Sequence, residues 1–350
     1  MQRIILHIDM DYFFAQIEEQ ENPQFKGKPI VVGADPKEGK GRGVVSTASY
    51  SARKYGIHSA LPISKAYQLC PQAIFLPVNM ELYQKVSEKI MEIVKKYSPP
   101  PKFGGGWEIV SLDEAFLDVS FLGSYEKAKN LATKLKNEIL EKEKLTATVG
   151  IGPNKLIAKM ATNQAKPNGL LLIKPNQVKS FLEPLDIEDL PGIGPKTAEK
   201  LREIGINKIK ELQRLSREKL KEMFGKVGET IYERARGIDE EPVSSEEIIK
   251  SIGKQITFEK DTRDSEIIFE NFEQMINEIH QELLKNKFSF RTITVVCRYQ
   301  GFETHTKSKT LKEATQDLGV LKKEAKKLLL KFFLESKKPI RLIGLRLKIC

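Results

Sequence analysis

The order strand, helix, strand, strand, helix, strand occurs twice along this chain and constrains the fold more than any other feature. Short apolar runs that suit buried strands alternate with segments of helical periodicity, first within residues 3–152 and again within residues 251–349. This order is typical of a split βαβ sheet. The two parts share no residue-level repeat at a fixed period, which excludes a solenoid. We therefore expect two α+β sheets, with a helical stretch after Ile173 and an acidic, Ser-rich tether over residues 237–247 between them.

The length and charge of the chain indicate several domains and a polyanionic partner. A chain of 350 residues exceeds one core, since single cores stop growing near ~250–300 residues. The net charge is +11, and residues 249–350 hold +8 of it, with 21 Lys and Arg against 13 Asp and Glu. Nucleic acid is the first partner to expect, although a thermophile-like charged surface has the same composition.

The cysteines and the apolar segments predict a cytoplasmic protein. The three cysteines, Cys70, Cys297 and Cys350, form no C-x-x-C pair, so neither a disulfide framework nor a zinc site is expected. No segment approaches the ~18–20 apolar residues of a membrane span, and the N-terminal run meets carboxylates too early for a secretory signal.

Three carboxylates accompany short apolar runs. Asp9 ends the strand expected over residues 3–8, where an unpaired carboxylate loses hydration unless a cation or a donor compensates it. Asp113 and Glu114 lie in a hairpin expected over residues 108–119, and they reach one site only where that hairpin twists or bulges. Taken singly, Asp9 could instead cap the following helix, and the other two could be exposed turn residues.

Taken together, these carboxylates favour a site for divalent metal ions. Three carboxylates at strand ends of one sheet form a hard oxygen cage that suits Mg²⁺ and triphosphate oxygens. Two such ions would activate a primer 3′-hydroxyl and neutralise charge on the β- and γ-phosphates. The chemistry that follows is phosphoryl transfer.

Five motifs in series closely resemble the Y-family DNA polymerases, especially the archaeal lesion-bypass enzymes and bacterial polymerase IV. The motifs are IDMDYFFAQIEE, STASYSARKYGI, SLDEAFLDVS, TVGIGPNKLIAKMAT and AKPNG. The resemblance covers essentially the whole chain and implies template-directed DNA synthesis of low fidelity, past damaged template bases. Two other classes stay open on the residues alone: a non-catalytic DNA-binding protein and a nucleotidyl cyclase.

The resemblance also implies roles for individual residues. Asp9, Asp113 and Glu114, with the main-chain carbonyl of Met10, would hold two Mg²⁺ ions. The deoxynucleoside triphosphate would be bound by Tyr12, Phe13, Thr47, Tyr50, Arg53 and Lys166. Phe14 corresponds to the steric gate, a ring that excludes the ribose 2′-hydroxyl. Periodicity alone would instead make Phe13 and Phe14 core residues, and Arg53 an ordinary surface residue.

Two further regions are expected to hold primer–template DNA. The Pro-Gly-x-Gly turn of residues 188–206 is typical of a helix-hairpin-helix, and it suggests phosphate contacts by Gly192, Gly194 and Lys196. A plain corner between two helices is the alternative. In the C-terminal sheet, strand alternation places His305, Lys307 and Lys309 on one face and Arg346 and Lys348 together. We include Lys307, Lys309, Arg341 and Arg346 among the DNA-binding residues; a solvated, Lys-bearing strand edge is the alternative.

The fold class expected is a right-hand α+β polymerase with a ferredoxin-like split-βαβ palm, small fingers, a helical thumb and a C-terminal βαββαβ little finger. The boundaries expected are residues 1–10 and 78–172 for the palm, 11–77 for the fingers, 173–237 for the thumb, 238–248 for a linker and 249–350 for the little finger. The protein is expected to be a monomer.

The segment of residues 98–107 is longer and richer in Pro and Gly than the segment that usually precedes the catalytic hairpin in this family. The chain stops at Cys350 without the family's usual sliding-clamp peptide, so these residues give no ground for clamp binding.

Overall fold

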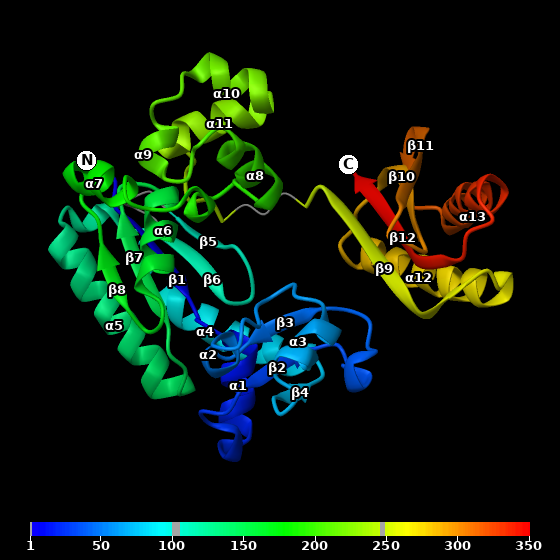
Figure 1. The fold of residues 1–350 in the computed structure, drawn as a ribbon, viewed down its shortest axis with the longest axis horizontal. Coiled ribbons are helices and arrows are strands. Elements are labelled where there is room, and N and C mark those ends of the chain that lie inside the picture. Colours follow the sequence, from blue (N-terminus) through cyan, green and yellow to red (C-terminus); the bar gives the residue numbers. More distant parts are fainter. Residues whose placement is uncertain (1, 100–105, 246–248) are drawn as a thin grey trace. The chain divides into compact units, whose positions relative to one another are not determined.

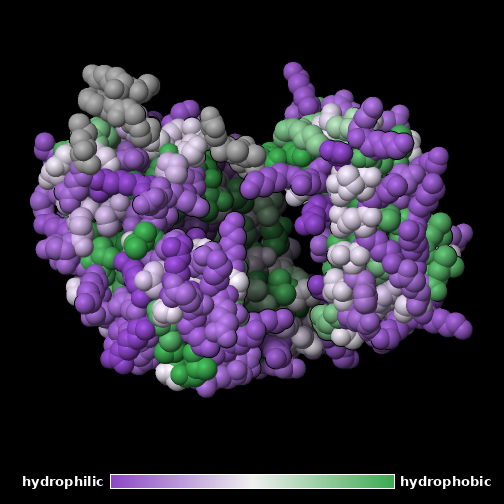
Figure 2. All heavy atoms as spheres, turned by 90° about the horizontal axis from the view of Figure 1, so that it is seen from above, coloured by the Kyte–Doolittle hydropathy of each residue, from purple (hydrophilic) through white to green (hydrophobic). Residues whose placement is uncertain are grey.

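The computed structural model describes residues 2–99, 106–245 and 249–350, so most of the unusual segment 98–107 lies outside the described residues. Two compact units make up the chain, residues 1–246 and residues 247–350 (Figure 1). Each unit has hydrophobic cores of its own. On the face shown in Figure 2, hydrophilic side chains predominate, with apolar ones in scattered groups. In the described part of the chain, no helix is both long and apolar enough to cross a membrane.

A five-stranded sheet is the centre of the first unit. Its order is β5-β6-β1-β7-β8, and β1 is antiparallel to both of its neighbours. The strands are β1 (Ile5–Asp9), β5 (Trp107–Ile109), β6 (Glu114–Asp118), β7 (Thr148–Gly152) and β8 (Leu170–Leu172). The predicted neighbourhood of the first strand and the hairpin is confirmed by this order.

Helices cover both faces of this sheet, and strand alternation assigns each side chain of β1 to one of them. Leu6 and Ile8 pack in the core shared with α4 (Met80–Lys96) and α5 (Tyr125–Glu143). Ile5, His7 and Asp9 face the other way, toward α6 (Lys155–Ala165), where Ile5 packs with Ala158. Asp9 therefore lies at the end of the face that α6 covers.

Glycine at the α6 face lets this helix lie directly on the strands. A Cβ built on Gly150 of β7 would lie 2.1 Å from the carbonyl oxygen of Ala158 and 2.4 Å from the amide nitrogen of Thr162. Backbone atoms cannot yield to such a contact, so any side chain there would push α6 away from the sheet.

A small three-stranded sheet and its helices lie between β1 and α4 in sequence. The sheet has the order β3-β2-β4 and a core of its own. The elements are α1 (Phe13–Glu21), η1 (Pro23–Phe25), β2 (Ile30–Gly33), η2 (Lys37–Gly39), β3 (Val45–Ala48), α2 (Tyr50–Arg53), α3 (Ile63–Leu69) and β4 (Ile74–Leu76). The sequence predicts strands over residues 28–33 and 43–47 and helices over residues 12–21, 49–55 and 64–70. All of these are present, and β4 is an additional strand that we did not expect.

The rest of the first unit is helical. After η4 (Ser120–Leu122), which precedes α5, the helical elements follow β8: η5 (Pro175–Gln177), α7 (Val178–Leu182), η6 (Ile187–Asp189), α8 (Pro195–Glu203), α9 (Ile209–Leu212), α10 (Arg217–Phe224) and α11 (Lys226–Ala235). They share a core that also includes Leu156 and Ile157 of α6.

The second unit is a four-stranded antiparallel sheet of order β11-β10-β12-β9. Its elements are β9 (Ser251–Thr262), α12 (Ser265–Lys285), β10 (Phe290–Tyr299), β11 (Thr304–Thr315), α13 (Leu318–Glu335) and β12 (Ile340–Ile349). The predicted order of six elements is confirmed. The sequence predicts a helix over residues 313–333, but α13 begins only at Leu318, because β11 continues to Thr315, which pairs with Phe290.

The segment expected as a tether contacts the first unit along much of its length. Asp239 accepts a hydrogen bond from the Leu156 amide at 2.9 Å, and its carbonyl accepts one from Arg3 at 3.2 Å. Val243 is buried against Ile5. These contacts place residues 239–243 on the sheet and α6, which their acidic and Ser-rich composition did not suggest.

Candidate active site

Asp9, which is buried, and Glu114, which is partly exposed, form a pair at the ends of two neighbouring strands. They are partners in the β1–β6 register, and each carboxyl group affects the pKa of the other. Asp9 is only 3% exposed. Burial raises the pKa of Asp9, because an ionised carboxylate is poorly hydrated there, although Lys166 acts in the opposite direction.

Two lysines compensate this pair. Lys166, just after α6, places its Nζ 2.6 Å from Asp9 Oδ2, and Lys159 within α6 places its Nζ 2.8 Å from Glu114 Oε2. Burial by itself would raise the pKa of Glu114, but the hydrogen bond from Lys159 and its positive charge lower this pKa. Each carboxylate thus has one cationic partner. Lys159 was not among the predicted residues; its only signal in the sequence is its place in the KLIAKMAT motif.

Asp113 is connected to the end of β1 by its backbone. Its carbonyl accepts a hydrogen bond from the Met10 amide at 3.0 Å, which joins the turn before β6 to the end of β1. Its side chain accepts a hydrogen bond from Ser111 Oγ at 2.6 Å. Among the residues that the structure describes, no three His, Cys, Asp or Glu side chains are grouped so as to hold a metal ion. The structure therefore brings Asp9 and Glu114 together but does not gather all three carboxylates.

The donor chemistry nevertheless fits divalent ions. Every candidate ligand at this end of the sheet is a hard oxygen, and the two carboxylates form ion pairs with Lys166 and Lys159. The Met10 carbonyl, the fourth expected ligand, accepts a hydrogen bond from Gln16 Nε2 at 3.1 Å.

Asp11 organises the loop that follows Asp9, a role that the sequence analysis missed. It has a positive φ of 60°, and its amide donates to Asp9 Oδ1 at 2.8 Å. Its carboxylate accepts hydrogen bonds from Thr148 Oγ1 at 2.5 Å, Thr146 Oγ1 at 3.1 Å and the Asn168 amide at 3.2 Å. These bonds connect the end of β1 to β7 and to the AKPNG motif.

The predicted nucleotide-binding residues of α2 lie next to this loop. The Tyr50 hydroxyl is 3.4 Å from Asp11 Oδ1, and the Arg53 guanidinium lies over the Tyr50 ring, 4.9 Å from its centre. Tyr12 packs edge-on against Tyr50 at 5.0 Å. Tyr12, Tyr50 and Arg53 therefore form one cluster, whereas Thr47 lies in β3, in the strand before α2.

Phe13 and Phe14 differ in their environments. Phe13 is 2% exposed and packs in the main core of the first unit, so its side chain has the core position that periodicity suggested. Phe14 is partly exposed, and its ring stacks on Tyr83 with centroids 4.2 Å apart. Of these two side chains, Phe14 is therefore the one that is accessible from solvent.

The Pro-Gly-x-Gly turn before α8 has the features expected of a helix-hairpin-helix. Gly192 has a φ of 97°, a conformation that glycine adopts without strain, and Gly194 is the N-cap of α8. Lys196 follows in the first turn of α8 and lines a shallow depression of about 540 Å³ together with Pro195 and Glu199.

The basic residues of the second unit lie on opposite faces of its sheet. Lys307 and Lys309 pair with the buried residues Val295 and Ile293, so they point to the helix-covered face, where Lys307 binds Glu335 of α13 at 2.6 Å. Arg346 and Lys348 pair with Thr294 and Thr292 and are exposed on the open face. Arg341 lies over the Phe302 ring and is 3.8 Å from Asp261.

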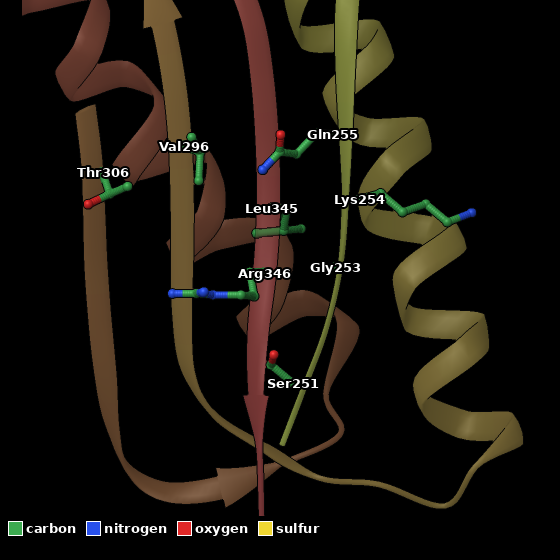
Figure 3. Close-up of a pocket in the computed structure, with 8 residues that line it drawn as sticks. All are labelled: Ser251, Gly253, Lys254, Gln255, Val296, Thr306, Leu345 and Arg346. Carbon is green, nitrogen blue, oxygen red and sulfur yellow. The ribbon is translucent and has the colours of Figure 1, made fainter. Parts of the chain in front are cut away.

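The open face of this sheet contains a depression of about 440 Å³ that is lined by Gly253, Gln255, Thr306 and Arg346 (Figure 3). Figure 3 shows Arg346 extended across β10, while Lys254 points away toward α12, where it binds Glu278 at 3.0 Å. The open face is therefore polar, with Arg346 and Lys348 as its cations on β12.

Comparisons with known proteins agree with this architecture. The impB/mucB/samB family matches residues 8–163, its C-terminal domain matches residues 249–348, and the DNA polymerase-iota thumb domain matches residues 188–239. DNA polymerase IV 2 of Methanosarcina mazei is 44% identical, with 98% of this chain and 91% of the relative aligned. DNA polymerase IV of Methanoculleus marisnigri is 43% identical over 99% of this chain and 94% of its own length.

Solved structures give the same result. A Y-family DNA polymerase chimera of Dbh and Dpo4 aligns with a TM-score of 0.88 at 37% identity, covering 99% of this chain and 98% of the chimera. The insertion ternary complex of Dbh DNA polymerase aligns with a TM-score of 0.68 at 36% identity, covering 99% and 98%. The chain belongs to the Y family of DNA polymerases, and the predicted right-hand α+β fold class is confirmed. Enzymes of this class use divalent metal ions.

Proposed function

We propose that this protein adds deoxynucleotides to a primer 3′ end under the direction of a DNA template, with low fidelity and past damaged template bases. The observation that carries the proposal is the Asp9–Glu114 pair, compensated by Lys166 and Lys159, where β1 ends and β6 begins. Its position beside the Tyr12, Tyr50 and Arg53 cluster supports a site where carboxylates and triphosphate-binding cations meet.

Asp9, Asp113, Glu114 and the Met10 carbonyl would hold two Mg²⁺ ions. Bound there, the ions would supply a lowered pKa for the primer 3′-hydroxyl and charge neutralisation on the phosphates. The contribution of the chain is to hold the carboxylates at adjoining strand ends. Glu114 and Asp9 are fixed by the β1–β6 register, and Asp113 by its backbone bond to Met10.

Lys166, Arg53 and Tyr50 would bind the triphosphate, with help from Thr47 and the main chain of Tyr12 and Phe13. Lys159 joins this set, because its ammonium contacts Glu114 at 2.8 Å, much as that of Lys166 contacts Asp9 at 2.6 Å. The deoxyribose would lie against the exposed part of Phe14, which would reject a 2′-hydroxyl by collision or by leaving it unpaired.

The division into palm (1–10 and 78–172), fingers (11–77), thumb (173–237), linker (238–248) and little finger (249–350) remains our proposal for the domains. The cores that residues 249–350 and the small three-stranded sheet have to themselves support it. Primer–template DNA would be held by Gly192, Gly194 and Lys196 of the thumb. In the little finger, Arg346 would contact it from the open face of the sheet, and Lys307, Lys309 and Arg341 remain proposed contacts elsewhere on the sheet. Phosphate contacts of this kind are independent of sequence. The protein would act as a monomer.

Low fidelity is supported by the size of the fingers. The insert between β1 and α4 carries a three-stranded sheet and short helices. An element of this size offers little surface for an induced-fit check of the new base pair.

Primer extension tests the proposal. With Mg²⁺, four deoxynucleotides and a primed template, we expect extension by the wild type and none by Asp113→Ala, while both proteins bind the DNA equally. A template with a lesion should be extended past the lesion. DNA binding without extension would indicate a non-catalytic DNA-binding protein, and a cyclic nucleotide formed without primer would indicate a cyclase; either result would overturn the proposal.

A further inference from the structure

Phe14 is held from behind by a second aromatic ring. Tyr83 of α4 stacks on it with centroids 4.2 Å apart and an interplanar angle of 14°. Tyr83 has no exposed surface, and its hydroxyl donates a hydrogen bond to Glu18 Oε1 at 2.6 Å. Phe14 and Glu18 are four residues apart in α1 and so lie on one face of this helix. A single side chain of α4 therefore holds both residues.

We propose that Tyr83 is the positioning residue for sugar selection: by stacking against Phe14 and binding Glu18, it prevents the Phe14 ring from yielding to a ribose 2′-hydroxyl. This inference rests on the proposed function, in which Phe14 contacts the sugar. It adds a residue from α4, about seventy positions along the chain, that never touches the nucleotide.

The physical reason is the stiffness that selection by collision requires. A ring excludes one extra oxygen only if it cannot retreat by a fraction of an ångström into the space behind it. Tyr83 fills that space. A parallel contact also resists tilting of the Phe14 ring, because tilting would sacrifice the stacking interaction.

The hydroxyl of Tyr83 adds a second constraint. Its hydrogen bond to Glu18 fixes the Tyr83 ring along the axis of α1, so that the ring cannot slide away from Phe14. Burial raises the pKa of Tyr83, which keeps the phenol protonated as a donor. Phe13, tilted against Phe14 at 5.8 Å, limits movement on another side.

The quantity to measure is the sugar discrimination ratio, kcat/KM for a deoxynucleotide divided by kcat/KM for the matching ribonucleotide. Tyr83→Met fills a similar volume without a flat ring, and we expect it to lower the ratio about tenfold, through faster ribonucleotide incorporation. Tyr83→Phe keeps the stacked ring and should stay closer to the wild-type ratio than Tyr83→Met does.

Two further measurements separate positioning from general stability. Tyr125→Met alters another buried tyrosine of the first unit, whose hydroxyl is bonded to the Arg3 carbonyl, and it should leave the ratio unchanged. In a Phe14→Ala background, Tyr83→Met should have no additional effect on the ratio, because the ring that it supports is gone.

Several outcomes overturn the inference. They are an unchanged ratio in Tyr83→Met, an equal change in Tyr125→Met, or a full additional loss in the Phe14→Ala background. Thermal unfolding checks each variant; Tyr83→Leu replaces Tyr83→Met if the latter does not fold, and failure of both assigns Tyr83 a purely structural role. If Phe14→Ala leaves the ratio unchanged while DNA synthesis continues, the sugar-gate assignment of Phe14 fails and the polymerase function stands.

Discussion

Lys166 Nζ lies 2.6 Å from Asp9 Oδ2, in an ion pair whose carboxylate side chain is only 4% exposed. Lys159 makes the equivalent contact with Glu114, and both side chains of that ion pair are more exposed than those of the Lys166–Asp9 pair. Both lysines come from one segment, α6 and the residue that follows it. The negative charge that divalent ions would neutralise is therefore already balanced by groups that can also bind a triphosphate.

Replacement of Lys159 by Met should strengthen the binding of divalent ions to the enzyme without nucleotide, at a pH where Glu114 is ionised. A competing cation is removed, and we expect the affinity to rise about tenfold. Binding of Mn²⁺, followed by electron paramagnetic resonance, measures this directly. Lys155→Met removes a different ion pair of α6, with Glu108, and serves as the control. Equal or weaker binding by Lys159→Met would show that Lys159 does not compete with the metal.

Lys166→Met should raise the KM for the incoming nucleotide by about tenfold or more, because a charge-assisted contact with the phosphates is lost. Steady-state single-nucleotide insertion on a primed template is the measurement. Lys174→Met changes a lysine whose nearest acidic partner, Glu126, is 3.9 Å away, and it should leave KM unaltered. A change in DNA affinity with KM preserved would contradict the assignment of Lys166 to the nucleotide.

Lys196→Ala should weaken binding of primer–template DNA equally for all sequences. The slope of log K against log salt should become shallower by about 1, as expected for the loss of one phosphate contact. Fluorescence anisotropy across a salt series gives both quantities. Lys127→Ala, a change of the same charge on α5, is the matched control. An effect that depends on DNA sequence would argue against a phosphate contact.

Glu273 should make the second unit sensitive to acid. Hydrogen bonds and charges from Lys326 and Lys322 lower the pKa of Glu273 from 4.5 to about 2. The stabilisation is therefore complete above pH 4.5 and is lost as the pH falls toward 2. Because the group is exposed, the effect should be small. Glu273→Gln should lower the unfolding temperature of residues 247–350 near neutral pH and lose this difference in acid.

Glu270→Gln, a change of the same charge on α12, should show no such convergence with the wild type. A difference between Glu273→Gln and wild type that persists unchanged into acid would mean that the two ion pairs contribute nothing through charge.

Local patterns in the sequence predicted most of the elements, because strands and helices of sufficient length have a clear hydrophobic period. β4 and β8 have only three residues each, too few for alternation to be read, and their strand character depends on neighbouring strands. The start of α13 was misplaced for a related reason. The end of β11 and the residues before α13 are similarly polar, so the sequence does not mark where the strand ends. Only the pairing of β11 with β10 shows this.

The sequence by itself determined the family, the order of elements and the neighbourhood of Asp9 and Glu114, since these depend on contiguous motifs and on strand alternation. Tertiary structure alone decided which cations meet those carboxylates, because Lys159 reaches Glu114 only when α6 lies directly on Gly150. It also decided that Lys307 and Arg346 point to opposite faces. Alternation separates neighbouring residues, but only helix packing determines which face of a sheet is covered.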